Sequence, residues 1–385
     1  MLKFRAKSNI VIGLLSVLSL LAFIAVENGK MDVKQKWYSE KLEAAKLSQL
    51  AANHLKNFRL ENGVFMDEVN DPNQTALIGQ EYSMITTDQG EIDSKLSSTN
   101  PNFAAVFVQL LKEAGLNDQD NVAVAFSGSF PGLNISVIAA LETLKLKPII
   151  ITSVGASNYG ANDPYFTWLD MENILYKSNI FHSKSVAAST GGGNDAGRGL
   201  SPEGRDLILK AIERNDIDFI NEKYIENSIA RRMEIYDKFS QGQPIKAFIN
   251  VGGGIASLGN TINGKLLPSG LTQQLPMSNF PLSGVIIEMG KKGIPIIHIL
   301  NINQLLEKYG LPINPVPLPD PGEGGIFIQK KYNVIVTSIA TLILIAVIAF
   351  IYLSERKHHR LGTDVVPLSG YQNQDKRDDD DLPGL

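Results

Sequence analysis

The chain has 385 residues, of which 44% are hydrophobic and 20% are charged, so its composition is that of a globular protein rather than a disordered or collagen-like one. It contains no cysteine, which excludes disulfide bonds, thiolate zinc sites, iron–sulfur clusters and a cysteine nucleophile. The formal net charge of −4 argues against nucleic acid as a partner. We predict neither a metal nor a cofactor.

Two uncharged apolar runs lie near the ends of the chain. The first, residues 8–26, follows the basic residues Lys3, Arg5 and Lys7, as in a signal sequence or a signal anchor. Because its apolar stretch is long and no small-x-small cleavage site follows it, we expect residues 1–27 to be a transmembrane anchor. The second run, 334–353, is long enough to cross about 30 Å of hydrocarbon, and we expect residues 333–353 to be a second transmembrane helix.

The short basic ends of the chain set the expected orientation. Lysines also flank the other ends of both runs, so counting charges alone comes close to a tie. Long loops cross a membrane largely regardless of their charge, and we therefore expect both termini in the cytoplasm and the central domain outside it. The tail, residues 354–385, is acidic and poor in apolar residues, and is predicted to be disordered and cytoplasmic.

The middle of the chain is predicted to be one α/β domain. We expect a helical stalk over residues 28–62, the domain itself over 63–310 and a proline-rich connector over 311–332. Within the domain, apolar runs of strand type alternate with stretches of helical periodicity. This alternation is typical of a doubly wound, mostly parallel, Rossmann-like sheet. The expected strands are 122–126, 148–151, 186–188, 246–251 and 294–299. The expected helices are 33–60, 134–144, 164–176, 202–214, 224–239 and 304–309, together with one that Asn100-Pro101 signals and that ends at Gly115.

Four loops that follow predicted strands are rich in glycine, serine and asparagine. Since ligands of open α/β sheets bind at the carboxyl ends of the strands, these loops are expected to line one cleft with backbone N–H groups and hydroxyls. The alternative is that glycine only permits tight turns between strand and helix. The candidate ligand-binding residues are Gly128, Ser157, Asn158, Asp163, Gly191, Gly192, Gly193, Asp195, Arg198, Gly252, Gly253 and Gly254.

A serine nucleophile is a second possibility. Ser127 and Ser129 lie in a predicted strand-to-helix turn, although their surroundings lack the Gly-x-Ser-x-Gly pattern. A base would have to come from a carboxylate or from His182, His298 or Lys95. His182 lies in a predicted loop and is the preferred candidate, whereas His298 lies in a predicted buried strand. The competing interpretation of both serines is helix capping and hydrogen bonding to a ligand.

Two further motifs have structural interpretations. Asp163 precedes Pro164 and is predicted to start a helix. Asp170 and Glu172 could act as acid and base or bind a metal, but residues two apart on a helix point in different directions. Residues 259–265 have the spacing of a phosphate-binding loop, yet the hydroxyl that would hold Mg²⁺ is replaced by a leucine, so we interpret the segment as a turn.

Three long phrases resemble the bacterial poly-γ-glutamate system protein family. They are Ala125-Phe-Ser-Gly-Ser-Phe-Pro-Gly-Leu-Asn134, the run from Ser153 to Pro164 with Phe166-Thr-Trp-Leu-Asp-Met-Glu172, and Gly191-Gly-Gly-Asn-Asp-Ala-Gly-Arg-Gly199. The similarity extends from the first apolar run to about Leu311. It implies an accessory protein of poly-γ-glutamate production in the bacterial cell membrane, acting beside other subunits, including a separate ATP-dependent ligase. No catalytic residues are established for the family.

Two classes of function follow. The first is an export, tethering or assembly subunit that binds poly-γ-glutamate, or a related carboxylate-rich ligand, without changing it. Arg198, Arg205 and Lys95 are the charged side chains expected to meet such a ligand. The second is a hydrolase or transferase acting on γ-glutamyl amides. A weaker third interpretation is a domain that binds sugars or phosphates.

Overall fold

The computed structural model describes residues 8–64, 66–276, 280 and 282–361. The chain divides into two compact units, one comprising Lys34–Gln329 and the other comprising the residues up to Val33 together with those from Lys330 onward. Lys3, Arg5, Lys7 and the part of the predicted acidic tail from residue 362 onward lie outside the described residues.

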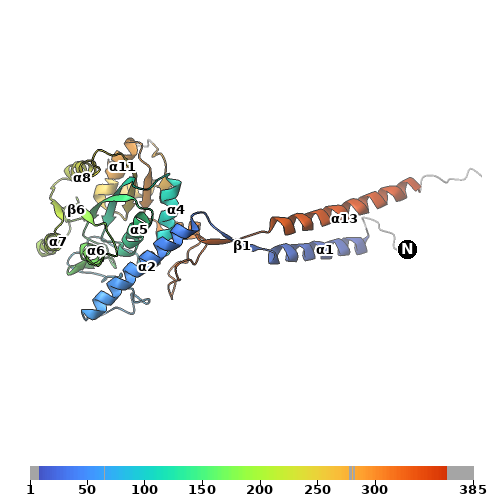
Figure 1. The fold of residues 1–385 in the computed structure, drawn as a ribbon, viewed down its shortest axis with the longest axis horizontal. Helices are drawn as coiled ribbons and strands as arrows, with labels where there is room; N and C mark the ends of the chain where they lie inside the picture. Colours follow the sequence, from blue (N-terminus) through green and yellow to red (C-terminus); the bar gives the residue numbers. More distant parts are fainter. Residues whose placement is uncertain (1–7, 65, 277–279, 281, 362–385) are drawn as a thin grey trace, which may run out of the picture. The chain divides into compact units, whose positions relative to one another are not determined.

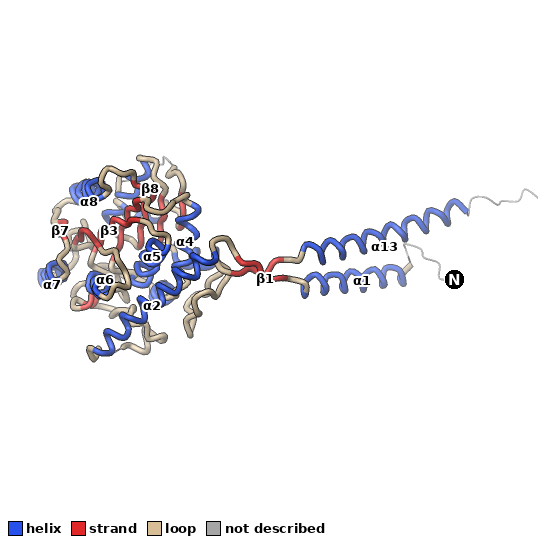
Figure 2. Tube along the Cα trace, viewed as in Figure 1, coloured by secondary structure: helices blue, strands red, loops and turns tan. Residues whose placement is uncertain are grey.

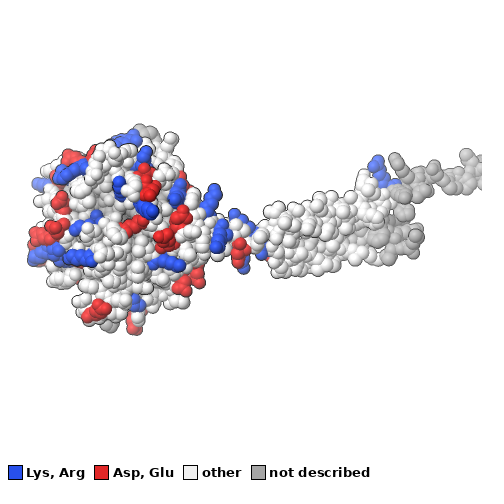
Figure 3. All heavy atoms as spheres, in the orientation of Figure 1, with Lys and Arg blue, Asp and Glu red and all other residues white. Residues whose placement is uncertain are grey.

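The second of these units contains two helices that are long and apolar enough to cross a membrane. They are α1 (Asn9–Asn28) and the Val334–Arg356 part of α13 (Val334–Leu361). In Figure 3 their surfaces are almost free of charged side chains. Residues 354–361, which we predicted to be disordered, instead continue α13, because Glu355, Arg356, Lys357, Arg360 and Leu361 have high helix propensity. Strands β1 (Met31–Lys34) and β11 (Ile328–Lys331) pair with each other.

A seven-stranded sheet forms the centre of the Lys34–Gln329 unit, in the order β7-β6-β3-β2-β8-β10-β9. Neighbouring strands are parallel except β9, which is antiparallel to β10. The five predicted strands are confirmed. The two that sequence analysis missed, β7 and β9, have three residues each and lie at the sheet edges. The strands are β2 (Asn121–Ser127), β3 (Lys147–Ser153), β6 (Ser185–Ser189), β7 (Asp218–Ile220), β8 (Ile245–Val251), β9 (Gly270–Thr272) and β10 (Ile296–Ile299).

Strand β2 is buried along its whole length because alternate side chains enter two different hydrophobic clusters. Val122, Val124 and Phe126 pack into one cluster, and Ala123 and Ala125 pack into the other. Figure 2 shows the strands between helix α8 (Ile225–Phe239) and helices α2 (Tyr38–Glu61), α5 (Pro131–Thr143) and α6 (Trp168–Lys177). The remaining helices are α3 (Ile92–Ser98), α4 (Phe103–Glu113), α7 (Pro202–Arg214), α9 (Ile255–Leu258), α10 (Thr261–Leu266), α11 (Val285–Lys291) and α12 (Ile302–Tyr309).

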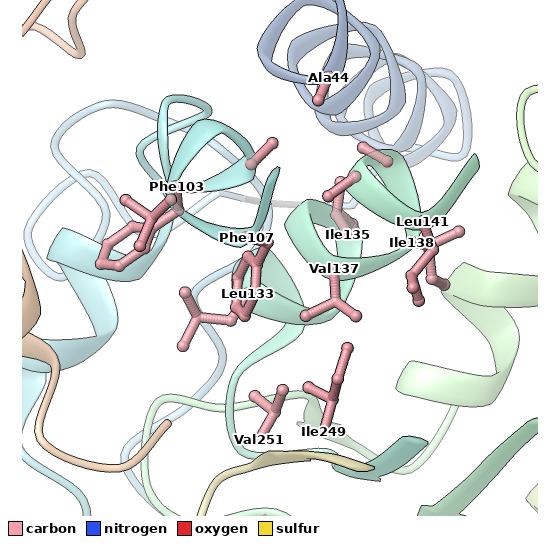
Figure 4. Close-up of a cluster of buried hydrophobic side chains, with 14 of the residues drawn as sticks. Ala44, Phe103, Phe107, Leu133, Ile135, Val137, Ile138, Leu141, Ile249 and Val251 are labelled. Atoms are coloured by element: carbon pink, nitrogen blue, oxygen red, sulfur yellow. The ribbon is translucent and has the colours of Figure 1, made fainter. Parts of the chain in front are cut away.

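Helix α2 is part of the domain rather than a stalk. Its small residues Ala44 and Ala45 are fully buried, which lets it pack closely against α4 and α5 (Figures 1 and 4). The helix begins at Tyr38, and not near residue 33 as predicted, because the residues before it form β1. The predicted proline-rich connector also packs on this unit, where the side-chain amide of Asn102 donates to the carbonyl of Asp320 at 2.9 Å.

The helix predicted to begin at Asp163 and Pro164 begins instead at Trp168. Asp163 belongs to a short hairpin in which β4 (Asn162–Asp163) pairs with β5 (Phe166–Thr167), so the proline lies in the turn between them. A capping box made by Thr167 and Asp170 starts the helix, because each side chain binds the backbone N–H of the other. The helix therefore begins four residues after its predicted start.

Phe107 tests the packing of α4 on the rest of this core. Its ring is fully buried beside Leu133 of α5 (Figure 4). We expect Phe107→Ala to lower the free energy of unfolding by about 3–5 kcal/mol, because the cavity that it leaves cannot close completely. Phe239→Ala is the matched control, since Phe239 is 38% exposed and its loss should cost about 0.5 kcal/mol or less. Equal thermal shifts for the two variants of the full chain would contradict this packing.

Candidate functional site

A cleft of about 370 Å³ lies at the carboxyl ends of the central strands. The loops after β2, β3, β6 and β8 all contribute to it, as the sequence predicted. Successive strands run in one direction along the sheet from β2 through β3 to β7, while β8 lies on the other side of β2. Such a reversal is where ligands of open α/β sheets bind. The lining residues are Thr87, Asp88, Gln89, Gly90, Glu91, Ser94, Lys95, Ser127, Ser129, Phe130, Ser153, Gly155, Ser157, Gly192, Gly193, Gly253, Gly254, Ile255, Thr261 and Leu300.

The turn after β2 is held by its own serines. The Ser127 hydroxyl accepts the Ser129 N–H at 3.3 Å, and the Ser129 hydroxyl accepts the Ser157 N–H at 3.0 Å. Gly128 donates its N–H to the carbonyl of Ser153 at 2.9 Å, and a side chain at this position would meet the carbonyl of Val154. Ser127 and Ser129 both line the cleft. Gly128 lets the turn approach the loop after β3, because it has no side chain to collide with that loop.

Lys95 enters the cleft from helix α3 and is 1% exposed. Its ammonium group donates to the Ser157 hydroxyl at 2.8 Å and to the carbonyl of Ser129, and it lies 3.8 Å from the centre of the Phe130 ring. No carboxylate among the described residues forms an ion pair with it. Burial lowers the pKa of Lys95 to about 7, because little compensates for the water that its charge has lost.

The segment 87–91 covers this lysine. Its backbone is attached to the loop after β3, because the N–H of Thr87 donates to Ala156 and the carbonyl of Asp88 accepts from Asn158. Gly90 lies so close to the pair below it that a side chain there would come within 2.9 Å of the Ser157 hydroxyl. Asp88 and Glu91 line the mouth of the cleft and are exposed.

The glycine-rich loop after β6 contributes two residues to the cleft, Gly192 and Gly193. Asp195, predicted to bind ligand, is instead buried in a structural ion pair with Arg232 of α8 at 2.9 Å, with both side chains 1% exposed. Its carboxylate also accepts hydrogen bonds from the hydroxyls of Ser153, Ser189 and Ser228. The physical reason is that a buried carboxylate must accept several hydrogen bonds to be stable. The acceptor positions of Asp195 are therefore occupied and not available to a ligand.

Two neighbours of Asp195 also have structural roles. The backbone of Arg198 pairs with Gly193, and its side chain is exposed and does not line the cleft. Gly191 has a φ of +77°, which lets the loop turn beside Gly155. Arg205, considered as a partner for an anion, donates to the carbonyl of Leu200 at 2.7 Å.

The loop after β8 offers donors to the cleft. Gly252 has a φ of +89°, and a side chain there would meet the Ser127 hydroxyl at 2.5 Å, so this residue supports the turn rather than lining the cleft. Gly253 and Gly254 do line it. Among the described residues, no acceptor pairs with the backbone N–H of Gly253 or Gly254. These two N–H groups are therefore available to a ligand.

Neither histidine lies in this cleft. His182 is exposed and pairs with Glu142 at 3.0 Å. Glu142 lies near the far end of α5, about 16 Å along the helix from the cleft, which corrects the prediction of His182 as a base for Ser127 or Ser129. His298 is buried in β10, where its Nδ1 lies 3.0 Å from the Asn250 side-chain amide, and burial lowers the pKa of His298 to about 4.

The remaining candidates lie away from the cleft. Asp163 pairs with Arg59 at 3.6 Å beside the β4–β5 hairpin. Asn158 is buried under segment 87–91 and does not line the cleft. Asp170 caps α6, and Glu172 is buried and accepts hydrogen bonds from Ser185. In the described part of the chain, no group of three or more His, Asp or Glu residues is arranged to hold a metal ion.

Sequence reasoning named Lys95 only as one of several possible partners and did not include segment 87–91. The lysine and Ser157 are separated by 62 residues, so no local spacing shows that they meet. The local sequence gives no other signal, because the residues that follow Lys95, from Ser97 to Asn102, are polar in sequence apart from Pro101, and only the fold shows that they are buried. A lysine in a buried stretch requires a polar environment.

Comparison of the chain with protein-family models, with curated proteins and with solved structures gave no match.

Removing the buried carboxylate tests the role of Asp195. Asp195→Ala should lower the free energy of unfolding by about 3–5 kcal/mol, because it leaves the Arg232 guanidinium buried without its partner. The matched control is Asp206→Ala, which removes the exposed pair with Lys210 and should cost less than about 1 kcal/mol. Thermal unfolding of the full chain measures both, and a small loss for Asp195→Ala would contradict the structural role.

Proposed function

We propose that the chain is a membrane-anchored accessory protein of poly-γ-glutamate production, and that its cleft binds carboxylate groups of the polymer or of its ends. The observation that supports this most directly is the pair of N–H groups at Gly253 and Gly254, which have no acceptor among the described residues and belong to residues that line a hydroxyl-rich cleft. Carboxylates accept hydrogen bonds and cannot donate them, so they suit such a lining.

Electrostatics support an anionic ligand in spite of the acidic character of the chain. Among the described lining residues, Lys95 is the only ionisable one that is buried. Asp88 and Glu91 lie exposed at the mouth of the cleft, where the solvent screens their negative charges. A volume of about 370 Å³ falls at the small end of the range of ligand pockets. It suits the end of a polymer, or one or two of its units, better than a long stretch.

The proposed function also includes the location of the domain in the cell and the type of its sheet. We place the cleft domain outside the cytoplasm of a bacterial cell, held by α1 and α13, where it would act with other subunits on a capsule-like polymer. We also propose that the sheet is doubly wound and Rossmann-like. Helix-borne clusters on both of its faces and the position of the cleft beside β2 and β8 support this view.

A hydrolase or transferase of γ-glutamyl amides is the second candidate function. Among the described residues, no base is hydrogen-bonded to the hydroxyl of Ser127 or Ser129, each of which accepts a backbone N–H group, and His182 lies elsewhere. The observation that favours this candidate is the contact between Lys95 and Ser157.

The binding proposal is tested by removing one N–H group. Gly254 has a φ of −52°, which proline can adopt, and space for a side chain is open at this position. Gly254→Pro deletes the donor, whereas Gly254→Ala keeps it and is the matched control. Because a hydrogen bond to a charged group contributes about 1.5–3 kcal/mol, we expect Gly254→Pro to weaken binding about 10- to 100-fold and Gly254→Ala to change it little.

The measurement is calorimetric titration of the full chain in detergent with a short γ-linked glutamate oligomer. The control ligand is the γ-linked oligomer of equal length in which every carboxylate is replaced by a carboxamide, and we expect it not to bind. Equal affinity for the two oligomers, or equal affinity of the two Gly254 variants, would contradict the proposal.

A further inference from the structure

We propose that Ser157 and Lys95 form a nucleophile and general base that cleave or transfer a γ-glutamyl amide in the cleft. The inference takes its substrate class from the proposed function, but its chemistry stands on separate observations. It replaces Ser127 and Ser129, the two candidate nucleophiles of the sequence analysis, with a serine from the next loop.

The geometry of the pair is the first observation. The Lys95 Nζ lies 2.8 Å from the Ser157 Oγ, within the range required for proton transfer. Both residues line the cleft, and they come from different elements, α3 and the loop after β3. The Ser129 carbonyl accepts a hydrogen bond from the amine and fixes its position, and Gly90 lies so close that a side chain there would meet the Ser157 hydroxyl and the Lys95 Cε.

The second observation is that the surroundings favour the neutral amine. The segments 127–131, 153–157 and 253–255 contribute no ionisable side chain, and segment 190–193 contributes none either. Asp88, Glu91 and Asp93 are the ionisable groups nearest along the chain, and all three are exposed. With a pKa of about 7, Lys95 is unprotonated in roughly half of the molecules at neutral pH, and its lone pair can then accept the serine proton.

The other hydroxyls of the cleft lack such a base. The Ser127 hydroxyl accepts the Ser129 N–H, and the Ser129 hydroxyl accepts the Ser157 N–H. Among the described residues, no amine, imidazole or carboxylate is hydrogen-bonded to either hydroxyl. Asp195 holds Ser153 in the buried ion-pair network. Ser157 is therefore the hydroxyl that the structure activates.

The reaction balances without any further reactant except water or an acceptor amine. The Ser157 Oγ attacks the amide carbonyl carbon while its proton passes to the Lys95 Nζ. The C–N bond then breaks, Lys95 returns that proton to the departing amine nitrogen, and an acyl ester of Ser157 remains. Water attacks the ester to release a γ-carboxyl group, or an amine attacks it to form a new amide. In each case Lys95 takes a proton from the attacking group and returns it to Ser157.

Turnover of γ-glutamyl p-nitroanilide by the full chain in detergent tests the inference, together with labelling by a fluorophosphonate followed by intact mass. Ser157→Ala and Lys95→Met should each lower the rate at least about 100-fold, and Ser157→Ala should also abolish the label. Ser178→Ala and Lys210→Met, both exposed and remote, are the matched controls and should keep the rate. Thermal unfolding of each variant confirms that it is folded.

The pH profile separates a base from a merely structural lysine. Because only the neutral amine accepts a proton, the rate of the unaltered chain should rise as pH increases through about 7 and then level off. A flat profile would overturn the role of Lys95.

The remaining outcomes distinguish this inference from the proposed function. Binding of the glutamate oligomer without turnover or label would overturn the catalytic pair and leave the binding function standing. Turnover that survives in Ser157→Ala would also overturn it. Turnover that depends on Ser157, without any binding of the oligomer, would support the pair and refute the ligand assignment.

Discussion

Strand β2 is the element on which the rest of the domain depends, because its side chains are buried on both faces. An apolar strand of this kind requires a layer of helices on each side, and the two hydrophobic clusters provide them. Its neighbours β3 and β8 then place their loops beside its carboxyl end. The cleft follows from this arrangement, since four loops meet where the order of the strands reverses.

Burial of charge shapes the cleft in two different ways. Arg232 and Asp195 neutralise each other under the glycine-rich loop and hold it in place, so they are unavailable to a ligand. Lys95 is equally buried but faces hydroxyls, a carbonyl and the Phe130 ring. A buried amine without a counter-charge lowers stability unless it loses its proton, and such arrangements are typical of functional sites. Among the described residues, Lys95 has no counter-charge, whereas Asp195 is paired with Arg232, and this difference identifies Lys95 as the group proposed to react.

Much of the fold could be predicted because it depends on local patterns. The apolar run 122–126 predicted β2, and the spacing of apolar residues predicted α7 and α8, since burial alone determines those patterns. The predicted start of α6 lies too early because an Asp-Pro pair such as Asp163 and Pro164 is typical both of a hairpin turn and of the start of a helix. Strands β7 and β9 are too short for alternation to show.

The site could be predicted only in outline. That glycine-rich loops would line one cleft follows from parallel topology, and Gly192, Gly193, Gly253 and Gly254 do line it. Which polar residues face the cleft depends on partners distant in sequence. Asp195 meets Arg232 and Lys95 meets Ser157 through the tertiary fold, and neither pairing leaves a trace in local spacing.

Hydrogen exchange of the full chain, with and without the γ-linked glutamate oligomer, tests the central claim most directly. The account predicts that the amide hydrogens of the segment containing Gly253 and Gly254 exchange more slowly when the oligomer is present, because its carboxylate accepts their hydrogen bonds. Unchanged exchange in that segment at saturating oligomer, or protection confined to a different part of the surface, would contradict it.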